Sequence, residues 1–282
     1  MKLKDLIRET ERRLRSARLH YGHGTDNPRD EAAFLVLRGL GLPLDTDPSR
    51  GANPMRVESL IQKRIQERIP AAYLLNEAWL DGLDFYVDRR VIIPRSHIAL
   101  LLKDLGIKPR RILDLCTGSG CLAILAARAF PDALVDASDI SLPALSVARA
   151  NVRRHKLQRR IRLVQSDLFS KLNARYDLIV SNPPYVSTPS MRRLPPEYRY
   201  EPGLALAGGR DGLEFVLRIL DGAPAHLTPR GLLVCEVGEH RKALERACPR
   251  TALHWPQDEV FTLERARMAG ASRSVSRPRR GA

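Results

Sequence analysis

The sequence has few aromatic residues and no long apolar segment. Tryptophan, tyrosine and phenylalanine together make up 5% of the 282 residues. Nowhere do 18 apolar residues follow one another, and the first 20 residues contain no apolar core of a leader peptide. We therefore expect neither a membrane span nor secretion, and we predict a cytoplasmic protein.

Cysteine is also scarce, and its spacing argues against a cross-linked or zinc-stabilised fold. The four cysteines, Cys116, Cys121, Cys235 and Cys248, form no Cys-x-x-Cys pair. Three of them lie in apolar or helical stretches, as reduced core thiols of a cytosolic protein do. The seven histidines show no metal-ligand spacing, so no metal site is expected.

Acidic residues are outnumbered by basic ones. The chain has 32 Asp and Glu against 47 Lys and Arg, which gives a net charge of +15. This excess favours a polyanionic neighbour such as RNA, or a substrate that sits among RNA. Genome base composition alone can also produce a chain rich in arginine, so the charge leaves both explanations open.

The chain divides into four parts. Residues 1–72 show helical spacing of apolar residues and predict a small helical domain. Residues 73–94 contain two extended runs around Asp81-Gly82, a strong hairpin signal, and are predicted to form a β-hairpin linker. Residues 95–268 form the main domain, and the polar, basic stretch 269–282 is expected to be a disordered tail.

The main domain alternates apolar, strand-like runs with helical stretches. Strands are expected at 110–116, 133–139, 160–167, 176–182, 231–238 and 260–265, and helices near 120–130, 142–155, 212–226 and 239–248. Such alternation predicts an α/β fold with a doubly wound, mostly parallel sheet.

A glycine-rich turn follows the first strand of this domain. In "LDLCTGSGCLA", Gly118 and Gly120 stand where the strand gives way to a helix, and glycines there let a ligand approach the backbone. The second strand ends at Asp139, where an acid can accept hydrogen bonds from two ribose hydroxyls. Together these features predict a site for an adenosine-containing cofactor at the carboxyl edge of the sheet.

Two cofactors suit this turn. Gly118, Gly120 and Ala123 satisfy the degenerate dinucleotide pattern G-x-G-x-x-A, which is typical of NAD sites. Asp114, an acid just before the glycines, instead suits the cationic methionine end of S-adenosylmethionine, a cofactor without phosphate. The turn leaves both cofactors open, and the fourth strand must decide between them.

The fourth strand ends in the tetrad Asn182-Pro183-Pro184-Tyr185, beside the expected ligand crevice. The nitrogen of a planar –NH₂ group is a poor nucleophile because its lone pair is delocalised. The Asn182 side-chain oxygen and the Pro183 carbonyl can accept hydrogen bonds from its two N–H groups. This arrangement turns the nitrogen lone pair toward a methyl donor. Pro184 stiffens the loop, and Tyr185 can stack on the flat group. The tetrad therefore favours methyl transfer to an –NH₂ group.

These motifs resemble a known family. "LDLCTGSGC", Asp139 and "SNPPYV" are similar to class I S-adenosylmethionine-dependent protein-glutamine N5-methyltransferases, and the resemblance covers nearly the whole chain. It implies a seven-stranded methyltransferase sheet and a helical N-terminal domain that recognises the substrate. Pro94-Arg95-Ser96, "CTGSGCLAI" and "LPPEYRYEP" resemble the branch that modifies large-subunit ribosomal protein three. The release-factor branch usually shows Pro-Arg-Pro instead.

The resemblance also implies roles for individual residues. The cofactor-binding residues would be Asp114, Thr117, Gly118 and Gly120 at the methionine end, Asp139 at the ribose, Asp167 at the adenine amino group, and Asn182. The catalytic residues would be Asn182, Pro183 and Tyr185, and these would bind the substrate together with Pro184 and Arg95. The implied partner is ribosomal protein three, unassembled or in an early intermediate, with rRNA contact through the basic surface.

The chain also departs from the family pattern, and other functions compete. His97 stands where the ribosomal branch more often has proline, and the glycine pair expected before the last strand is missing. The alternatives are a release-factor glutamine methyltransferase, a nucleic-acid adenine N6-methyltransferase, an NAD-dependent dehydrogenase, and a basic RNA-binding assembly factor with a vestigial cofactor site. The adenine enzyme would use the same tetrad, but the sequence shows no separate target-recognition domain.

Overall fold

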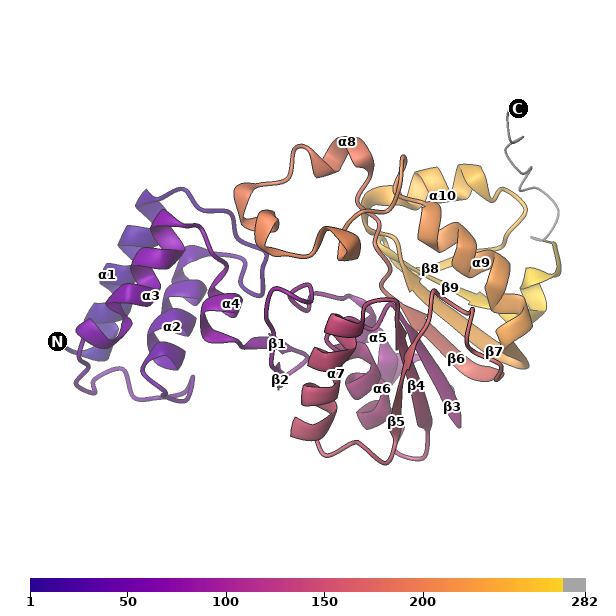
Figure 1. The fold of residues 1–282 in the computed structure, drawn as a ribbon, viewed down its shortest axis with the longest axis horizontal. Coiled ribbons are helices and arrows are strands. Elements are labelled where there is room, and N and C mark those ends of the chain that lie inside the picture. The colour runs from indigo at the N-terminus through magenta and orange to yellow at the C-terminus, as the bar shows by residue number, and fades with distance from the viewer. Residues whose placement is uncertain (271–282) are drawn as a thin grey trace. The chain divides into compact units, whose positions relative to one another are not determined.

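A computed structural model describes residues 1–270 of the chain, and its fold is drawn in Figure 1. Internal contacts divide the chain into two units. Unit 1 comprises residues 1–95 together with 193–203, and unit 2 comprises residues 96–192 and the chain from 204 onward. Each unit is built from its own secondary structure and its own core.

Unit 1 is mainly helical, as the apolar spacing predicts. Its helices are α1 (Leu3–Ser16), α2 (Pro28–Gly39), α3 (Met55–Gln66) and α4 (Ala71–Leu75). Helix α2 begins where the Asn27 side chain accepts hydrogen bonds from two backbone N–H groups of the first turn. Leucine, valine and isoleucine side chains of α1, α2 and α3 form one buried cluster, so these helices bury their apolar faces against one another.

A hairpin follows the helices. Strands β1 (Ala78–Leu80) and β2 (Leu83–Phe85) pair antiparallel. Asp81 and Gly82 have φ angles of 46° and 77°, and a two-residue turn of this type needs a positive φ at both positions. The hairpin predicted from Asp81-Gly82 is thus present.

Residues 193–203 pack with unit 1, although the sequence places them in the main domain. This segment contains the 3₁₀ helix η2 (Pro196–Tyr200) and two buried acids, Glu197 and Glu201. Glu197 accepts a hydrogen bond from the His20 backbone and pairs with Arg68 at 2.8 Å. Glu201 accepts from the Ile93 N–H at 3.0 Å. A buried carboxylate needs such partners, and these partners lie in unit 1.

Unit 2 contains a seven-stranded, mostly parallel sheet, so the predicted fold class is confirmed. The strands are β3 (Arg111–Leu115), β4 (Leu134–Asp139), β5 (Ile161–Gln165), β6 (Tyr176–Ser181), β7 (Leu227–Glu236), β8 (His254–Gln257) and β9 (Val260–Glu264). Their order is β5-β4-β3-β6-β7-β9-β8, with β9 antiparallel to both of its neighbours. The apolar runs of the sequence predict neither β8 nor the first four residues of β7.

Helices cover both faces of this sheet (Figure 1). They are α5 (Ile98–Leu101), α6 (Cys121–Ala129), α7 (Leu142–Arg154), α9 (Glu214–His226) and α10 (Arg241–Ala247), whereas α8 (Thr188–Met191) lies in the segment that follows β6. The chain also forms the short 3₁₀ turns η1 (Leu102–Asp104), η3 (Gly203–Ala205), η4 (Gly238–His240) and η5 (Arg265–Gly270). Of the expected disordered tail, residues 269 and 270 end η5, and 271–282 lie outside the described residues.

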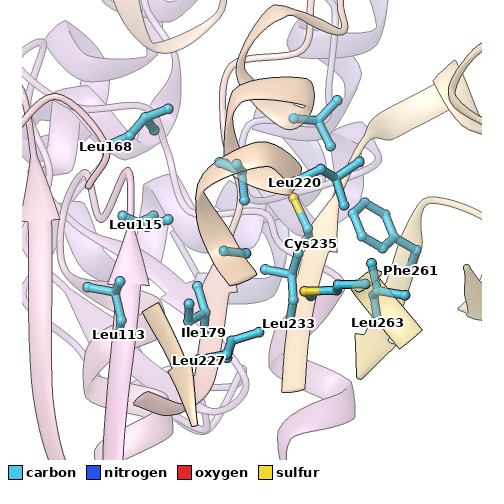
Figure 2. Close-up of a cluster of buried hydrophobic side chains, with 14 of the residues drawn as sticks. Leu113, Leu115, Leu168, Ile179, Leu220, Leu227, Leu233, Cys235, Phe261 and Leu263 are labelled. Carbon is cyan, nitrogen blue, oxygen red and sulfur yellow. The ribbon is translucent and has the colours of Figure 1, made fainter. Parts of the chain in front are cut away.

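Side chains alternate between the two faces of the sheet along each strand. Leu113 and Leu115 of β3 join Ile179, Leu233 and Phe261 in the core cluster shown in Figure 2. Side chains of successive strand residues point to opposite faces, so Asp114 lies on the other face.

Between residues 1 and 270, no helix is long and apolar enough to cross a membrane.

Candidate active site

The glycine-rich turn and the tetrad leave the sheet side by side. The chain builds β3, β4 and β5 outward in one direction and then returns to place β6 on the other side of β3. Leu115, the last residue of β3, pairs with Ser181, the last residue of β6, and the Ser181 hydroxyl donates to the Leu115 carbonyl at 2.9 Å. A reversal of this kind opens a crevice at the carboxyl ends of the two strands, where ligands of α/β sheets bind.

The two glycines of the turn serve different purposes. Gly118 has a φ of +54°, and a Cβ built there would meet nothing within 4 Å. Gly120 has a φ of +80°, and its Cβ would lie 3.2 Å from the Cβ of Ala148 on α7. Gly118 therefore leaves open space for a ligand, whereas Gly120 lets helices α6 and α7 pack closely.

Asp114 is fully buried beneath this turn. Its Oδ2 accepts hydrogen bonds from the Thr117 hydroxyl at 2.5 Å and from the Ala123 N–H at 3.0 Å. Its Oδ1 is buried without a hydrogen-bond partner in the described part of the chain. Burial raises the pKa of Asp114 to about 7. A buried carboxylate oxygen with no partner is costly, and a cationic ligand group would relieve that cost.

Asp139 joins the end of β4 to the glycine turn. Its Oδ2 accepts from the Gly118 N–H at 2.9 Å, and its Oδ1 accepts from the Ser141 N–H at 2.9 Å. Each carboxylate oxygen keeps further acceptor capacity, which two ribose hydroxyls could use. Burial raises the pKa of Asp139 above its usual value. The end of the second strand predicts this acid as a site residue, but its contact with Gly118 was not predicted.

A second polar side chain that supports the glycine-rich turn was not predicted from the sequence. Asn151 is fully buried in the last turn of α7, and its side chain donates to the Ser119 carbonyl at 2.9 Å. Asparagine is disfavoured within helices. Its position on the apolar face of α7 was therefore the sequence signal that could have identified this contact.

The predicted adenine contact, Asp167, lies in a different environment. It follows β5, its side chain is 47% exposed, and both of its oxygens lie 2.8 Å from Nη2 of Arg218. Arg218 was not anticipated as a neighbour. A role for Asp167 at the adenine amino group stays a prediction.

The tetrad is held firmly but leaves its amide accessible. Pro183 is buried, whereas Asn182 and Tyr185 are half-buried. Beyond Tyr185, Val186 exchanges backbone hydrogen bonds of 2.8 Å with Leu206 and Gly208. No residue in the described chain forms a hydrogen bond with the Asn182 side chain. Its amide oxygen is therefore available to accept from a bound group.

Arg95, predicted to bind the substrate, belongs to unit 1. Its guanidinium pairs with both carboxylate oxygens of Glu201, with Nη2–Oε2 at 2.6 Å, and its side chain is 23% exposed. This pairing anchors the 193–203 segment, and a role of Arg95 in substrate binding stays a prediction. His97 is exposed and lies 3.6 Å from the Glu259 carboxylate.

Glu236 was not predicted as a site residue. This buried acid ends β7, and it accepts a hydrogen bond from the Tyr185 hydroxyl at 3.3 Å. Burial raises its pKa. A lone acid inside the apolar run "GLLVCEVG" was the sequence signal that could have identified it.

Within residues 1–270, no cluster of His, Cys, Asp and Glu is arranged to hold a metal ion.

Comparison with known proteins agrees with this geometry. The family model named Methyltransferase small domain matches residues 97–193. The ribosomal protein uL3 glutamine methyltransferase of Bordetella pertussis is 52% identical, with 94% of this chain and 96% of the relative covered. Proteins of the same name from Neisseria meningitidis serogroup B and Burkholderia pseudomallei are each 47% identical. The alignments cover 95% and 90% of this chain, and 94% and 89% of those relatives.

The sheet, the glycine turn and the family match define an α/β methyltransferase. Identity near one half over almost the whole length then narrows the assignment. The chain belongs to the family of ribosomal protein uL3 glutamine methyltransferases. The resemblance inferred from the motifs, including the choice of the ribosomal branch, is thereby confirmed.

Proposed function

We propose that this protein transfers a methyl group from S-adenosylmethionine to the side-chain amide nitrogen of a glutamine in ribosomal protein uL3. One observation carries the proposal above all others. Strands β3 and β6 are neighbours, and they bring the Gly118 turn and the Asn182-Pro183-Pro184-Tyr185 tetrad to one edge of the sheet. Relatives with this name are about half identical to the chain.

The residues of the turn suit S-adenosylmethionine. The unpartnered Oδ1 of Asp114 would meet the cationic methionine end, and the space beside Gly118 would admit the ligand close to the backbone. Asp139 would accept from the ribose hydroxyls. When bound, this cofactor supplies an electrophilic methyl group on a sulfonium centre.

The tetrad orients the nucleophile. The Asn182 side-chain oxygen and the Pro183 carbonyl accept hydrogen bonds from the two N–H groups of the glutamine amide. The nitrogen lone pair therefore points away from these acceptors and toward the methyl donor. Both acceptors bind more strongly as positive charge develops on the nitrogen, and such interactions raise the rate rather than only the affinity. As the N–C bond forms and the C–S bond breaks, the nitrogen becomes acidic. Its proton then leaves without a dedicated base.

The basic surface favours action near ribosomal RNA. Between Asp139 and Asp167 the sequence contains no acid but several cations, Arg149, Arg153, Arg154, Lys156, Arg159, Arg160 and Arg162. The first five are exposed on α7 and the turn that follows it. A strip of this kind suits the phosphates of nascent rRNA, and such contacts weaken as salt rises. The enzyme therefore acts in the cytoplasm on uL3 that is free or in an early assembly intermediate.

Labelled S-adenosylmethionine with alternative substrates tests the proposal. The protein is incubated with free uL3, with release factor and with mature large subunits, and mass spectrometry locates the label. We expect one modified glutamine in free uL3 and little label in mature subunits. Label on release factor alone would overturn the substrate and leave the chemistry standing. Label on adenine of nucleic acid would overturn the protein substrate altogether.

A further inference from the structure

Glu236 is a buried acid that links three elements of unit 2. It ends β7 and is 1% exposed. Its Oε2 accepts from the Ser96 hydroxyl at 2.6 Å and from the His97 N–H at 3.2 Å, just before α5. Its Oε1 accepts from the Tyr185 hydroxyl at 3.3 Å. An acid buried to this extent is retained only with such partners, so its contact with the tetrad calls for a role.

We propose that Glu236 is a positioning residue that fixes the ring of Tyr185 for methyl transfer. The inference rests on the proposed function, because Tyr185 is taken there to cover the planar amide of the substrate. A ring that stacks on a flat group has to keep a narrow range of distance and tilt. Small displacements in such an arrangement are expensive for the rate.

Packing against two glycine backbones also restrains Tyr185. A Cβ on Gly238 would lie 2.8 Å from ring atom Cε2, so the backbone of η4 lies directly against the ring. A Cβ on Gly208 would lie 2.6 Å from the Tyr185 Cα, so a second backbone segment holds the main chain. Glu236 adds a polar hold at the outer end of the side chain. These restraints come from different elements and act on the same side chain.

The two oxygens of Glu236 separate this role from a merely structural one. Oε2 holds the start of α5 through Ser96, whose hydroxyl also accepts from the Ile98 N–H at 3.3 Å. Oε1 alone contacts Tyr185. Ser96→Ala therefore disturbs the α5 anchor and leaves the Tyr185 contact in place. A loss of rate that depends on Tyr185 has to come through Oε1.

A double-mutant cycle tests the inference. The variants are Glu236→Gln, Tyr185→Phe and Ser96→Ala, together with the two combinations Glu236→Gln/Tyr185→Phe and Ser96→Ala/Tyr185→Phe. The control is Glu239→Gln, which removes an exposed acid three residues away. Glu236→Gln keeps a hydrogen-bonding group beside the Tyr185 hydroxyl but exchanges a carboxylate for a neutral amide, so it should lower kcat/KM for uL3 by about threefold to tenfold. The dissociation constant for S-adenosylmethionine should change by less than about twofold, because Glu236 touches no residue assigned to the cofactor.

The combined variant decides the outcome. If Glu236 acts through the Tyr185 hydroxyl, Glu236→Gln/Tyr185→Phe is no slower than the worse single variant, whereas Ser96→Ala and Tyr185→Phe multiply. Multiplying losses for Glu236→Gln and Tyr185→Phe, or an unchanged rate in Glu236→Gln, would overturn the inference.

An NMR measurement keeps this test independent of the substrate. The ring signal of Tyr185, assigned by its absence in Tyr185→Phe, should shift and broaden in Glu236→Gln and stay unchanged in Glu239→Gln. An unaltered ring signal in Glu236→Gln would refute the positioning role even if uL3 were not the substrate. A wild-type protein inert toward uL3, with the expected ring signals, would refute only the proposed function.

Discussion

Asp139 offers a quantitative test of the cofactor site. Its oxygens are 2.9 Å from the Gly118 and Ser141 N–H groups, and two ribose hydroxyls would share the same oxygens. Hydrogen bonds to a charged group are worth roughly 1.5–3 kcal/mol each. Losing one of them toward the ribose, by Asp139→Ala, should weaken S-adenosylmethionine binding by about 10-fold to 150-fold, and losing both should weaken it by more than about 100-fold.

The same substitution also removes two acceptors from the protein itself. The N–H groups of Gly118 and Ser141 lose their partners, so Asp139→Ala should cost on the order of 1–3 kcal/mol of stability, while Asp139→Asn should cost less. Asp132, exposed at the other end of β4, supplies the control Asp132→Ala. Isothermal calorimetry measures affinity, and urea unfolding measures stability. Unchanged affinity in a folded Asp139→Ala variant would show that the cofactor is placed wrongly.

Three further predictions follow from buried charge and backbone geometry. Burial raises the pKa of Asp114 to about 7, so the folded protein keeps a proton that the unfolded chain has released. Stability should therefore fall as the pH rises from about 4 to 7, and urea unfolding of Asp114→Asn should lack that part of the pH dependence. Arg64 is fully buried with its Nε 2.7 Å from Glu31. Arg64→Met should destabilise unit 1 by about 3–5 kcal/mol, because it leaves a buried acid unpaired, whereas exposed Arg56→Met should not; thermal unfolding compares them. Gly118→Ala should cost only about 1–2 kcal/mol of stability, from its positive φ, yet weaken cofactor binding more than tenfold in calorimetry, since the methyl group enters open space that the ligand needs.

The sequence predicted those features whose signals are local. The hairpin at Asp81-Gly82 depends on two residues that adopt positive φ, and the parallel strands depend on continuous apolar runs. The glycine turn and the tetrad were located because each follows a strand, and the order of the strands then brings them together.

Features that depend on contacts distant in sequence could not be predicted. Residues 193–203 pack with unit 1 because buried Glu197 and Glu201 find partners there. Strand β8 is short, its side chains alternate between exposed and half-buried, and its pairing with β9 creates it. The contact of Glu236 with Tyr185 spans 51 positions, and no local pattern indicates it.

The central claim is that the tetrad orients a glutamine amide for methyl transfer, and Asn182 tests it most directly. The measurement is the single-turnover rate of transfer from saturating labelled S-adenosylmethionine to free uL3, for the wild type and for Asn182→Ala. The Asn182 oxygen has no partner among the described residues and is proposed to bind the amide more strongly as charge develops. Its loss should slow transfer by roughly 10²–10³ and leave cofactor affinity nearly unchanged. An Asn182→Ala variant that methylates uL3 at the wild-type rate would mean that the tetrad is only a rigid turn, and the proposed mechanism would be wrong.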